Sequence, residues 1–279
     1  MRPLPPLFAV GLLVTAAAIL TGACGVLSKL APSPTVYVAL GDSLAAGTGS
    51  TVPAERGYAA HVGRWLQAEA RERVDRVVNL AIGGETSDTL ITGGQLDAAL
   101  EAIRNPDTDV RIVSLDIGGN DLLGLLADGP CAVDPTGPAC QAAVQIAQSQ
   151  FAGTYEQVVS SLAGALAKAR RPGRLVVATY YNPFSGTGSV YEAPTDVALL
   201  GSDGVLDCQA NAVAPDRIGL NDVIACIAVA HGAVIADTYP AFAQRGADLT
   251  NILVQDVHPN DAGHVVFADV IRRALEASG

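Results

Sequence analysis

Short apolar runs rich in Val, Ile and Leu recur along the chain and are separated by longer stretches with helical periodicity. An apolar run of roughly four to eight residues bounded by turn residues is typical of a strand that is buried on both faces. The sequence therefore predicts strands over residues 35–40, 76–82, 110–117, 174–181 and 233–239.

The stretches between these runs carry apolar side chains at the three- and four-residue spacing of amphipathic helices. The predicted helices cover residues 58–74, 94–104, 142–170, 215–232 and 261–278. Because strands and helices alternate, we expect right-handed crossovers and helices on both faces of the sheet. The predicted fold class is α/β, a three-layer α/β/α sandwich with a mostly parallel five-stranded sheet and no second domain.

The N-terminal region resembles a bacterial lipoprotein signal peptide. Arg2 precedes the apolar run "LFAVGLLVTAAAIL", which is short for a membrane span, and "LTGAC" then brings small residues before Cys24. The resemblance implies acylation of Cys24, although Thr21 stands where such signals usually have Leu. Secretion with cleavage after Ala23 and an uncleaved anchor are the alternatives. All three export the protein, to the cell envelope as a lipid-anchored protein or beyond it as a secreted one.

This interpretation divides the chain into a signal peptide (1–23), a lipid-anchor linker (24–34) and a globular domain (35–279). Cysteine content supports export independently, because setting Cys24 apart leaves an even number. The four others form two local pairs and predict the disulfides Cys131–Cys140 and Cys208–Cys226. Each bridge would stabilise the fold by roughly 3 kcal/mol in an oxidising compartment. Four buried thiols are the alternative, more typical of a cytosolic protein.

Composition and charge narrow the range of partners. Apolar residues make up 49% of the 279 residues, which is typical of a globular protein. The formal charge of −11, without a run of Lys or Arg, argues against nucleic acid as a partner. This negative charge is compatible with a small neutral or cationic substrate. We also expect a monomer that needs no metal or other cofactor.

Polar residues and glycines that could take part in catalysis follow several of the predicted strands. Ser43 follows the first strand in "YVALGDSLAAGTG", and Gly84 follows the second in "NLAIGGETS". Asn120 follows the third in "DIGGND", and His258 stands in "QDVHPND", before the C-terminal helix. Ligands of parallel sheets collect at the carboxyl ends of the strands, so we expect these four residues to meet. Serine, a base and amide donors for an oxyanion are the parts that acyl transfer requires.

These motifs resemble the blocks of the SGNH, or GDSL, hydrolase family, and the resemblance spans essentially the whole mature chain. "GDSL" (41–44), "GGETS" (83–87), "GGND" (118–121) and "HPNDAGH" (258–264) occur in the family's order. The resemblance implies a flavodoxin-like sandwich with Ser43 as nucleophile and His258 as general base. It also implies an oxyanion hole made by the amides of Ser43 and Gly84 and the side chain of Asn120.

One position departs from the family pattern. The family usually has an aspartate three residues before the histidine, where this chain has Gln255. Asp256 stands two residues before His258, and residues i and i+2 of an extended segment point to the same side. Asp256 is therefore the candidate triad acid, and a backbone carbonyl that orients the histidine is the alternative.

Other polar and aromatic residues have structural interpretations. His61, His231 and His264 are expected to be a solvated side chain, a helix C-terminal residue and a packing or capping group. Asp42 and Asp121 are expected to accept hydrogen bonds from local backbone amides. The aromatic residues that follow the fourth strand suit either the core or an acyl-chain site: Tyr180, Tyr181 and Phe184.

The sequence thus predicts an exported serine esterase or lipase that hydrolyses carboxylic esters of lipids or acylated envelope components. An O-deacetylase of an envelope glycan is the alternative within catalysis, and a lipid-anchored binding module without turnover is the alternative outside it. The segment 182–207 shows no periodicity and is expected to form a lid or a groove wall.

Overall fold

The computed structural model describes residues 32–127, 129–206 and 217–279. The predicted signal peptide, most of the predicted linker, and Cys24 and Cys208 lie outside these residues. Within the described part of the chain, no helix is both long enough and apolar enough to cross a membrane.

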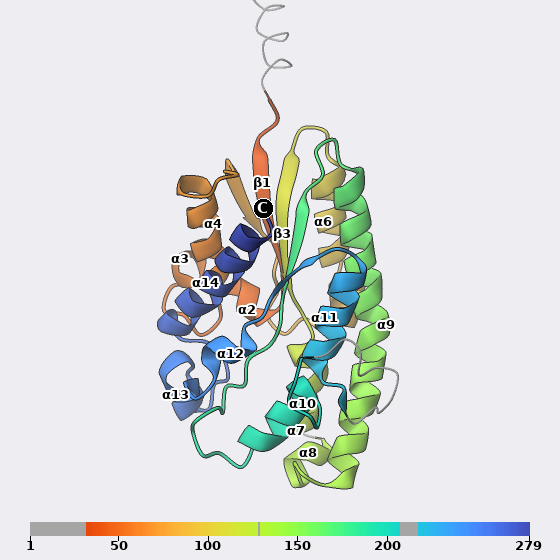
Figure 1. Cartoon of the computed structure of the whole chain (residues 1–279), viewed down its shortest axis with the longest axis vertical. Helices are drawn as coiled ribbons and strands as arrows, with labels where there is room; N and C mark the ends of the chain where they lie inside the picture. Colours follow the sequence, from red (N-terminus) through yellow and green to blue (C-terminus); the bar gives the residue numbers. More distant parts are fainter. Residues whose placement is uncertain (1–31, 128, 207–216) are drawn as a thin grey trace, which may run out of the picture.

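A single parallel sheet forms the centre of the molecule (Figure 1). Its strands are β1 (Thr35–Gly41), β2 (Arg76–Asn79), β3 (Asp109–Asp116), β4 (Arg174–Ala178) and β5 (Val234–Ala236). They are arranged in the order β2-β1-β3-β4-β5, and every neighbouring pair is parallel. The predicted fold class is therefore confirmed.

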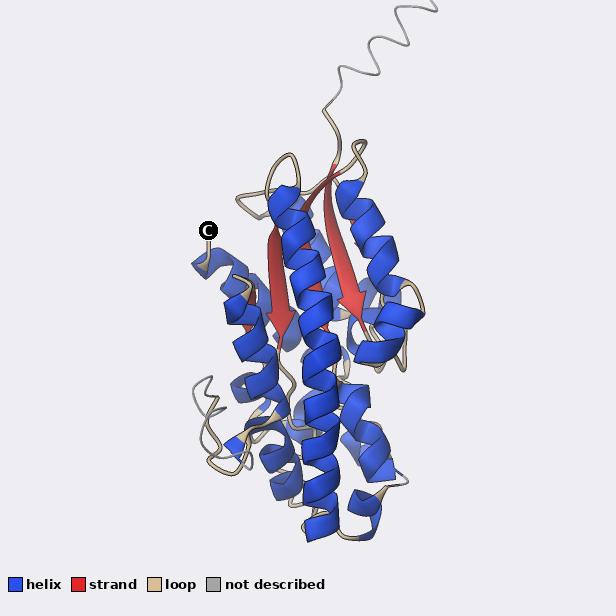
Figure 2. Cartoon of the chain, turned by 90° about the vertical axis from the view of Figure 1, so that its right-hand side faces the viewer, coloured by secondary structure: helices blue, strands red, loops and turns tan. Residues whose placement is uncertain are grey.

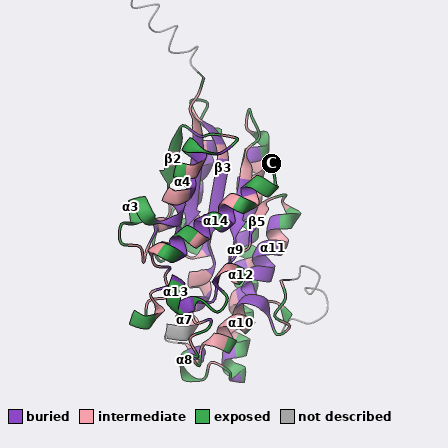
Figure 3. Ribbon diagram, turned by 60° about the vertical axis from the view of Figure 1, so that its left-hand side comes forward, coloured by how far each residue is buried: buried purple, intermediate pink, exposed green. Residues whose placement is uncertain are grey.

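The five strands differ in how deeply they are buried (Figure 3). Nearly all residues of β1 and β3 are buried, whereas β2 is mostly exposed because it is an edge strand. The prediction that all five strands are buried on both faces is therefore wrong for β2, and β5, at the other edge, is only partly buried. The apolar runs also continue past the ends of β2, β4 and β5, where the chain leaves the sheet toward the site.

Helices cover both faces of the sheet (Figure 1). On one face, α4 (Tyr58–Ala68) packs against α14 (Asp261–Ala277), and on the other α9 (Pro138–Lys168) packs against α6 (Gln95–Arg104) and α11 (Leu220–Ala230). These are the five predicted helices, with shifted ends. The shorter helices are α2 (Ser43–Ala46), α3 (Pro53–Arg56), α5 (Ser87–Thr92), α12 (Tyr239–Phe242), α13 (Gly246–Leu249) and the 3₁₀ helix η3 (Ile252–Val254).

Helix α9 is much longer than the strands it covers. Its 31 residues span roughly 46 Å, whereas the eight residues of β3 span roughly 26 Å. It therefore runs past the carboxyl ends of the strands, as Figure 2 shows. Helices α7 (Gly119–Ala127) and α8 (Pro130–Val133) pack against α9 there and form walls beside the site.

The segment 182–207 is not without regular structure, contrary to the sequence-based expectation. It contains α10 (Glu192–Leu200), which packs against α11. Its Pro194 lies in the first turn, where a proline removes no intrahelical hydrogen bond. The amphipathic pattern of such a short helix is weak, and its contacts with α11 stabilise it instead.

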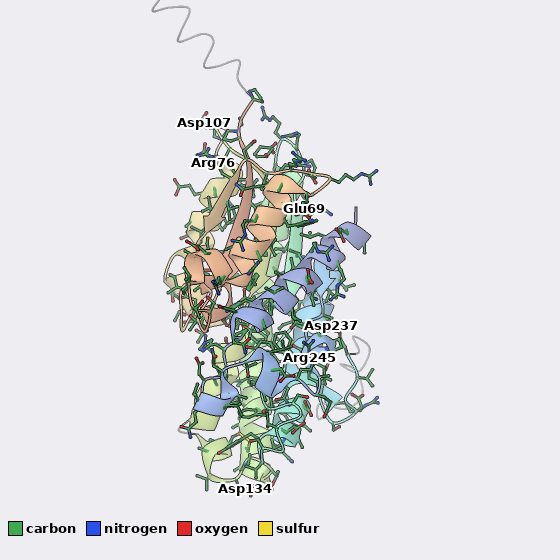
Figure 4. All side chains as sticks on the ribbon, turned by 90° about the vertical axis from the view of Figure 1, so that its left-hand side faces the viewer. Glu69, Arg76, Asp107, Asp134, Asp237 and Arg245 are labelled. Carbon is green, nitrogen blue, oxygen red and sulfur yellow. A yellow bond between two sulfur atoms is a disulfide. The ribbon has the colours of Figure 1, made fainter. Side chains whose placement is uncertain are left out.

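One of the two predicted disulfides is present, between Cys131 at the start of α8 and Cys140 at the start of α9. It closes a turn that contains Asp134, at the end of the molecule opposite Asp107 (Figure 4). The second predicted bridge involves Cys208, which lies outside the described residues.

Candidate active site

Ser43 lies at the junction of β1 and α2, where the backbone requires a glycine at position 41, two residues before it. Gly41 has φ +140°, and a Cβ there would lie 2.1 Å from the Asp116 carbonyl oxygen. The next residue, Asp42, caps α2 by accepting a 2.9 Å hydrogen bond from the Leu44 amide to its Oδ1. Ser43 is the first residue of α2, so its own amide has no intrahelical carbonyl partner.

The His258 side chain reaches Ser43 from the loop between α13 and α14. Its Nε2 lies 2.8 Å from Ser43 Oγ. The loop is held by a 2.9 Å hydrogen bond from the Asn251 amide to the His258 carbonyl. Gly49 approaches from the other side so closely that a Cβ on it would lie 2.7 Å from His258 Cβ. His258 therefore lies between two loops that come from opposite ends of the sequence, and its side chain remains 23% exposed.

Asp256 contacts the other nitrogen of the same ring. Asp256 Oδ1 lies 2.5 Å from His258 Nδ1 and accepts a 3.0 Å hydrogen bond from the His258 amide. The preceding residue, Gln255, has φ +63°, and this left-handed conformation turns the chain at the start of the acid–histidine segment. A carboxylate only accepts, so it favours the tautomer with the proton on Nδ1. Nε2 is then free to accept the hydrogen bond from the Ser43 hydroxyl.

The predicted oxyanion donors lie at the neighbouring strand exits. Asn120 follows β3, and its Nδ2 donates a 2.8 Å hydrogen bond to the Glu85 carbonyl, adjacent to Gly84. Only one amide hydrogen of Asn120 is used in this bond. Gly84 has φ +83° in an exposed loop, a conformation that favours glycine. Asn120 and Ser43 line the same cavity, at the switch point between β1 and β3.

Beneath Ser43 lies a pair of buried acids that sequence analysis missed as a unit. The Tyr180 hydroxyl donates a 2.6 Å hydrogen bond to Asp42 Oδ2, and the Tyr58 hydroxyl donates to Asp116 Oδ1. Burial raises the pKa of Asp42, and burial together with the nearby Asp42 charge raises the pKa of Asp116 well above its usual value. Both carboxyl groups therefore favour the protonated form more than an exposed aspartate does. An acid inside the apolar run "IVSLDI" was the available signal.

Three histidines have the structural roles that the sequence suggested. His264 is buried, accepts from the Tyr58 amide and donates to the Thr48 carbonyl, and burial lowers its pKa. His61 contacts Arg64 at the surface, and His231 ends α11 beside Glu156.

Asp121 differs from its predicted local role. It accepts a 3.0 Å hydrogen bond from the Ser87 amide, a contact between two distant strand exits. Asp121 therefore joins α7 to the start of α5. The predicted bond of Asp42 to a local amide is present, as described above.

A cavity extends from Ser43 and His258 between α7, α10 and the disulfide. Tyr180, Tyr181 and Phe184 line it, and both tyrosines are also buried in the core, so the two alternatives suggested for them coexist. Among the described residues, no group of three or more His, Cys, Asp or Glu side chains could hold a metal ion.

This arrangement, a flavodoxin-like sheet with serine, histidine and aspartate in contact at the carboxyl ends of its strands, is typical of serine hydrolases. The profile of the GDSL-like Lipase/Acylhydrolase family matches residues 39–266. The chain therefore belongs to this family and is a carboxylic ester hydrolase. A comparison with curated protein sequences gave no match.

Several solved structures share the fold. A lipase from a goat rumen metagenome is 20% identical, with a TM-score of 0.61 over 86% of this chain and 97% of its own. An acetylxylan esterase from Geobacillus stearothermophilus is 20% identical, with a TM-score of 0.57 over 88% and 96% of the two chains. An extracellular lipase from Streptomyces rimosus is 23% identical, with a TM-score of 0.55 over 86% and 99%.

Proposed function

We propose that this protein is an exported serine esterase or lipase that forms an acyl-enzyme on Ser43. The observation that carries the proposal is the continuous contact from Asp256 through His258 to Ser43, with distances of 2.5 Å and 2.8 Å. A serine hydroxyl is a weak nucleophile until a base takes its proton, and His258 Nε2 is within reach of that proton.

In the first half of the reaction, His258 accepts the Ser43 proton as Ser43 Oγ attacks the ester carbonyl carbon. The carbonyl oxygen becomes an oxyanion, to which the amides of Ser43 and Gly84 and the Asn120 side chain donate. The imidazolium, stabilised by Asp256, then protonates the leaving alcohol. In the second half, His258 takes a proton from water as its oxygen attacks the acyl-enzyme carbonyl carbon. His258 then returns that proton to Ser43 Oγ as the bond to the acyl group breaks, which releases the carboxylic acid.

Reaction with a fluorophosphonate probe tests this proposal directly. We expect the purified protein to be labelled on Ser43, as identified by peptide mass spectrometry, and Ser43→Ala to remain unlabelled. Ser50→Ala is the control, because Ser50 lies in the neighbouring loop and donates to the Gly47 carbonyl. An unlabelled wild-type protein that folds normally would favour the binding module over the enzyme.

Export and anchoring form the second part of the proposal. The Cys131–Cys140 disulfide supports an oxidising compartment, and the sequence before residue 35 supports a cleaved signal with an acylated Cys24. Acylation predicts that the protein partitions with membranes and that Cys24→Ser releases it or leaves it unprocessed. Mass spectrometry of a mature N-terminus at an unmodified Cys24 would contradict lipidation and leave secretion in place.

A further inference from the structure

The cavity beside Ser43 is polar at one end and apolar along the rest of its length. Its polar residues lie around Ser43, where Asn120 and His258 also border it. Most of the other residues that line it are apolar, and Tyr180, Tyr181 and Thr195 also carry hydroxyl groups. The apolar wall residues from α7, the loop after β4 and α10 are Leu122, Leu123, Phe184, Pro194, Ala198 and Leu199.

The disulfide forms part of this wall. Cys131 and Cys140 are both buried and both line the cavity, together with Val144 of α9. The part of α9 that runs past the sheet therefore supports the cavity, and the disulfide fixes α8 against it. This part of the wall therefore contains a covalent cross-link between two helices.

The size of the cavity limits what it can accept. Centres of water-sized groups can occupy about 120 Å³ of it. A cavity needs about 10–15 Å³ of such space to hold one water molecule. A methylene group is close in size to a water molecule. The cavity therefore exceeds what an acetyl group fills and leaves room for a longer alkyl chain.

The chemistry of the site decides which half of an ester enters this cavity. The alcohol of a lipid or a glycan is polar and must leave, and Gly84 and the His258 side of the site are open to solvent. The acyl group stays on Ser43 until water arrives, and its chain gains from burial in an apolar wall. Each buried methylene is worth about fourfold in binding.

We propose that this cavity is an acyl-chain site for esters of fatty acids longer than acetate. The inference rests on the proposed function, in which Ser43 carries the acyl group. It specifies the substrate class as esters of longer acyl chains rather than acetyl esters of a glycan. The wall of α10 and the disulfide determines chain length.

The first test compares kcat/KM for p-nitrophenyl acetate and p-nitrophenyl octanoate below their micellar concentrations. We expect the wild-type protein to prefer octanoate by at least about 100-fold, because the octanoyl chain buries six more methylene groups in the cavity than the acetyl group does. Ala198→Phe fills the cavity from α10 and should lower the octanoate-to-acetate ratio by at least about tenfold. Ala198→Leu is a smaller plug and should lower it less.

The matched control is Ala193→Phe, the same substitution on the same helix at an exposed position outside this cavity. It should keep the wild-type ratio. A wild-type preference for acetate, or an equal change of the ratio in both variants, would overturn the acyl-chain site and leave ester hydrolysis intact. Because the readout is a ratio, partial loss of active protein does not alter it.

A second measurement separates the cavity from the catalysis. Ser43→Ala cannot form an acyl-enzyme, yet it keeps the wall, so calorimetry should detect decanoate binding at least about 100-fold tighter than acetate binding. Ala198→Phe in the same background should weaken decanoate binding at least about tenfold. If Ser43→Ala binds decanoate selectively but the wild-type protein hydrolyses no ester, the proposed function is overturned and the acyl-chain site is kept. Absence of decanoate binding would overturn the acyl-chain site.

Discussion

Tyr180 donates a 2.6 Å hydrogen bond to Asp42, the residue whose other carboxylate oxygen caps the helix that begins at Ser43. The exit of β4 is thereby joined to the exit of β1 beneath the candidate nucleophile. Asp42 is 2% exposed, so water cannot replace a lost donor easily. The position of Ser43 thus depends on a strand that contributes no residue to the catalytic set.

Tyr180→Phe should therefore destabilise the protein by about 1–3 kcal/mol, since a buried acceptor loses its partner. The measurement is the free energy of unfolding by denaturant. Tyr239→Phe is the matched control, because it also removes a tyrosine–aspartate hydrogen bond, to Asp196, at a less buried site. Equal losses in the two variants would contradict a special role for burial.

Asp116→Asn should change how stability depends on pH. Burial raises the pKa of Asp116 well above 3.8, so above about pH 4 the folded protein keeps a proton that the unfolded chain has released. Stability from this group is therefore lost as pH rises toward its folded pKa. Asparagine has no such proton, and its amide oxygen can still accept from Tyr58. The stability of the variant relative to wild type should increase as the pH rises above about 4, and a difference independent of pH would refute this.

Ser43→Ala and His258→Ala should each lower kcat by several orders of magnitude without unfolding the protein, because neither residue is part of the apolar core. Since the two side chains act as one unit, the double variant should lose little more than either single variant. Steady-state kinetics of all three variants give the comparison. Additive losses would speak against a shared nucleophile and base.

Asn120→Ala removes the predicted side-chain donor to the oxyanion. We expect kcat to fall by roughly 10²–10³ with little change in KM, because the bond forms with the charge that develops in the transition state. Asn105→Ala, at the end of α6, controls for the loss of an amide elsewhere. A defect confined to KM would assign Asn120 to substrate recognition instead.

Asp256→Asn tests the acid at its unusual spacing. Asp256 contacts both His258 Nδ1 and the His258 amide, so its loss should cost up to about 10⁴ in kcat. Gln255→Asn preserves the left-handed conformation and should have little effect. A loss of less than tenfold in Asp256→Asn would mean that a backbone carbonyl orients the ring.

The double variant Gln255→Asp/Asp256→Asn moves the carboxylate to the position that is usual in the family. Recovery of activity relative to Asp256→Asn would indicate that a carboxylate is needed and that its position is adjustable. Continued inactivity would indicate that the turn at Gln255 fixes the acid to residue 256.

The strand exits were predictable because sequence order and strand direction alone bring Ser43, Asn120 and His258 to one edge. The spacing of Asp256 and His258 made Asp256 the candidate acid but left a backbone carbonyl as the alternative. The turn that accompanies the contact has a positive φ at Gln255, and no glycine marks that position in the sequence. The exposure of β2 follows from its place at the sheet edge, which its own residues do not encode. Helix α10 escaped prediction because its contacts with α11 stabilise it more than its own periodicity does.

The direction of β1 also determines how the protein would be oriented if it were tethered through its N-terminal segment. Thr35 begins the strand and Ser43 follows its end, and seven residues of strand separate the two edges of the sheet by roughly 23 Å. In Figure 1 the chain enters β1 at the top, whereas α2 lies below the strand, near the middle of the molecule. A tether that precedes Thr35 would therefore hold the molecule at the end of the sheet opposite Ser43. The candidate site would then face away from the point of attachment, toward esters on an opposing surface or in solution.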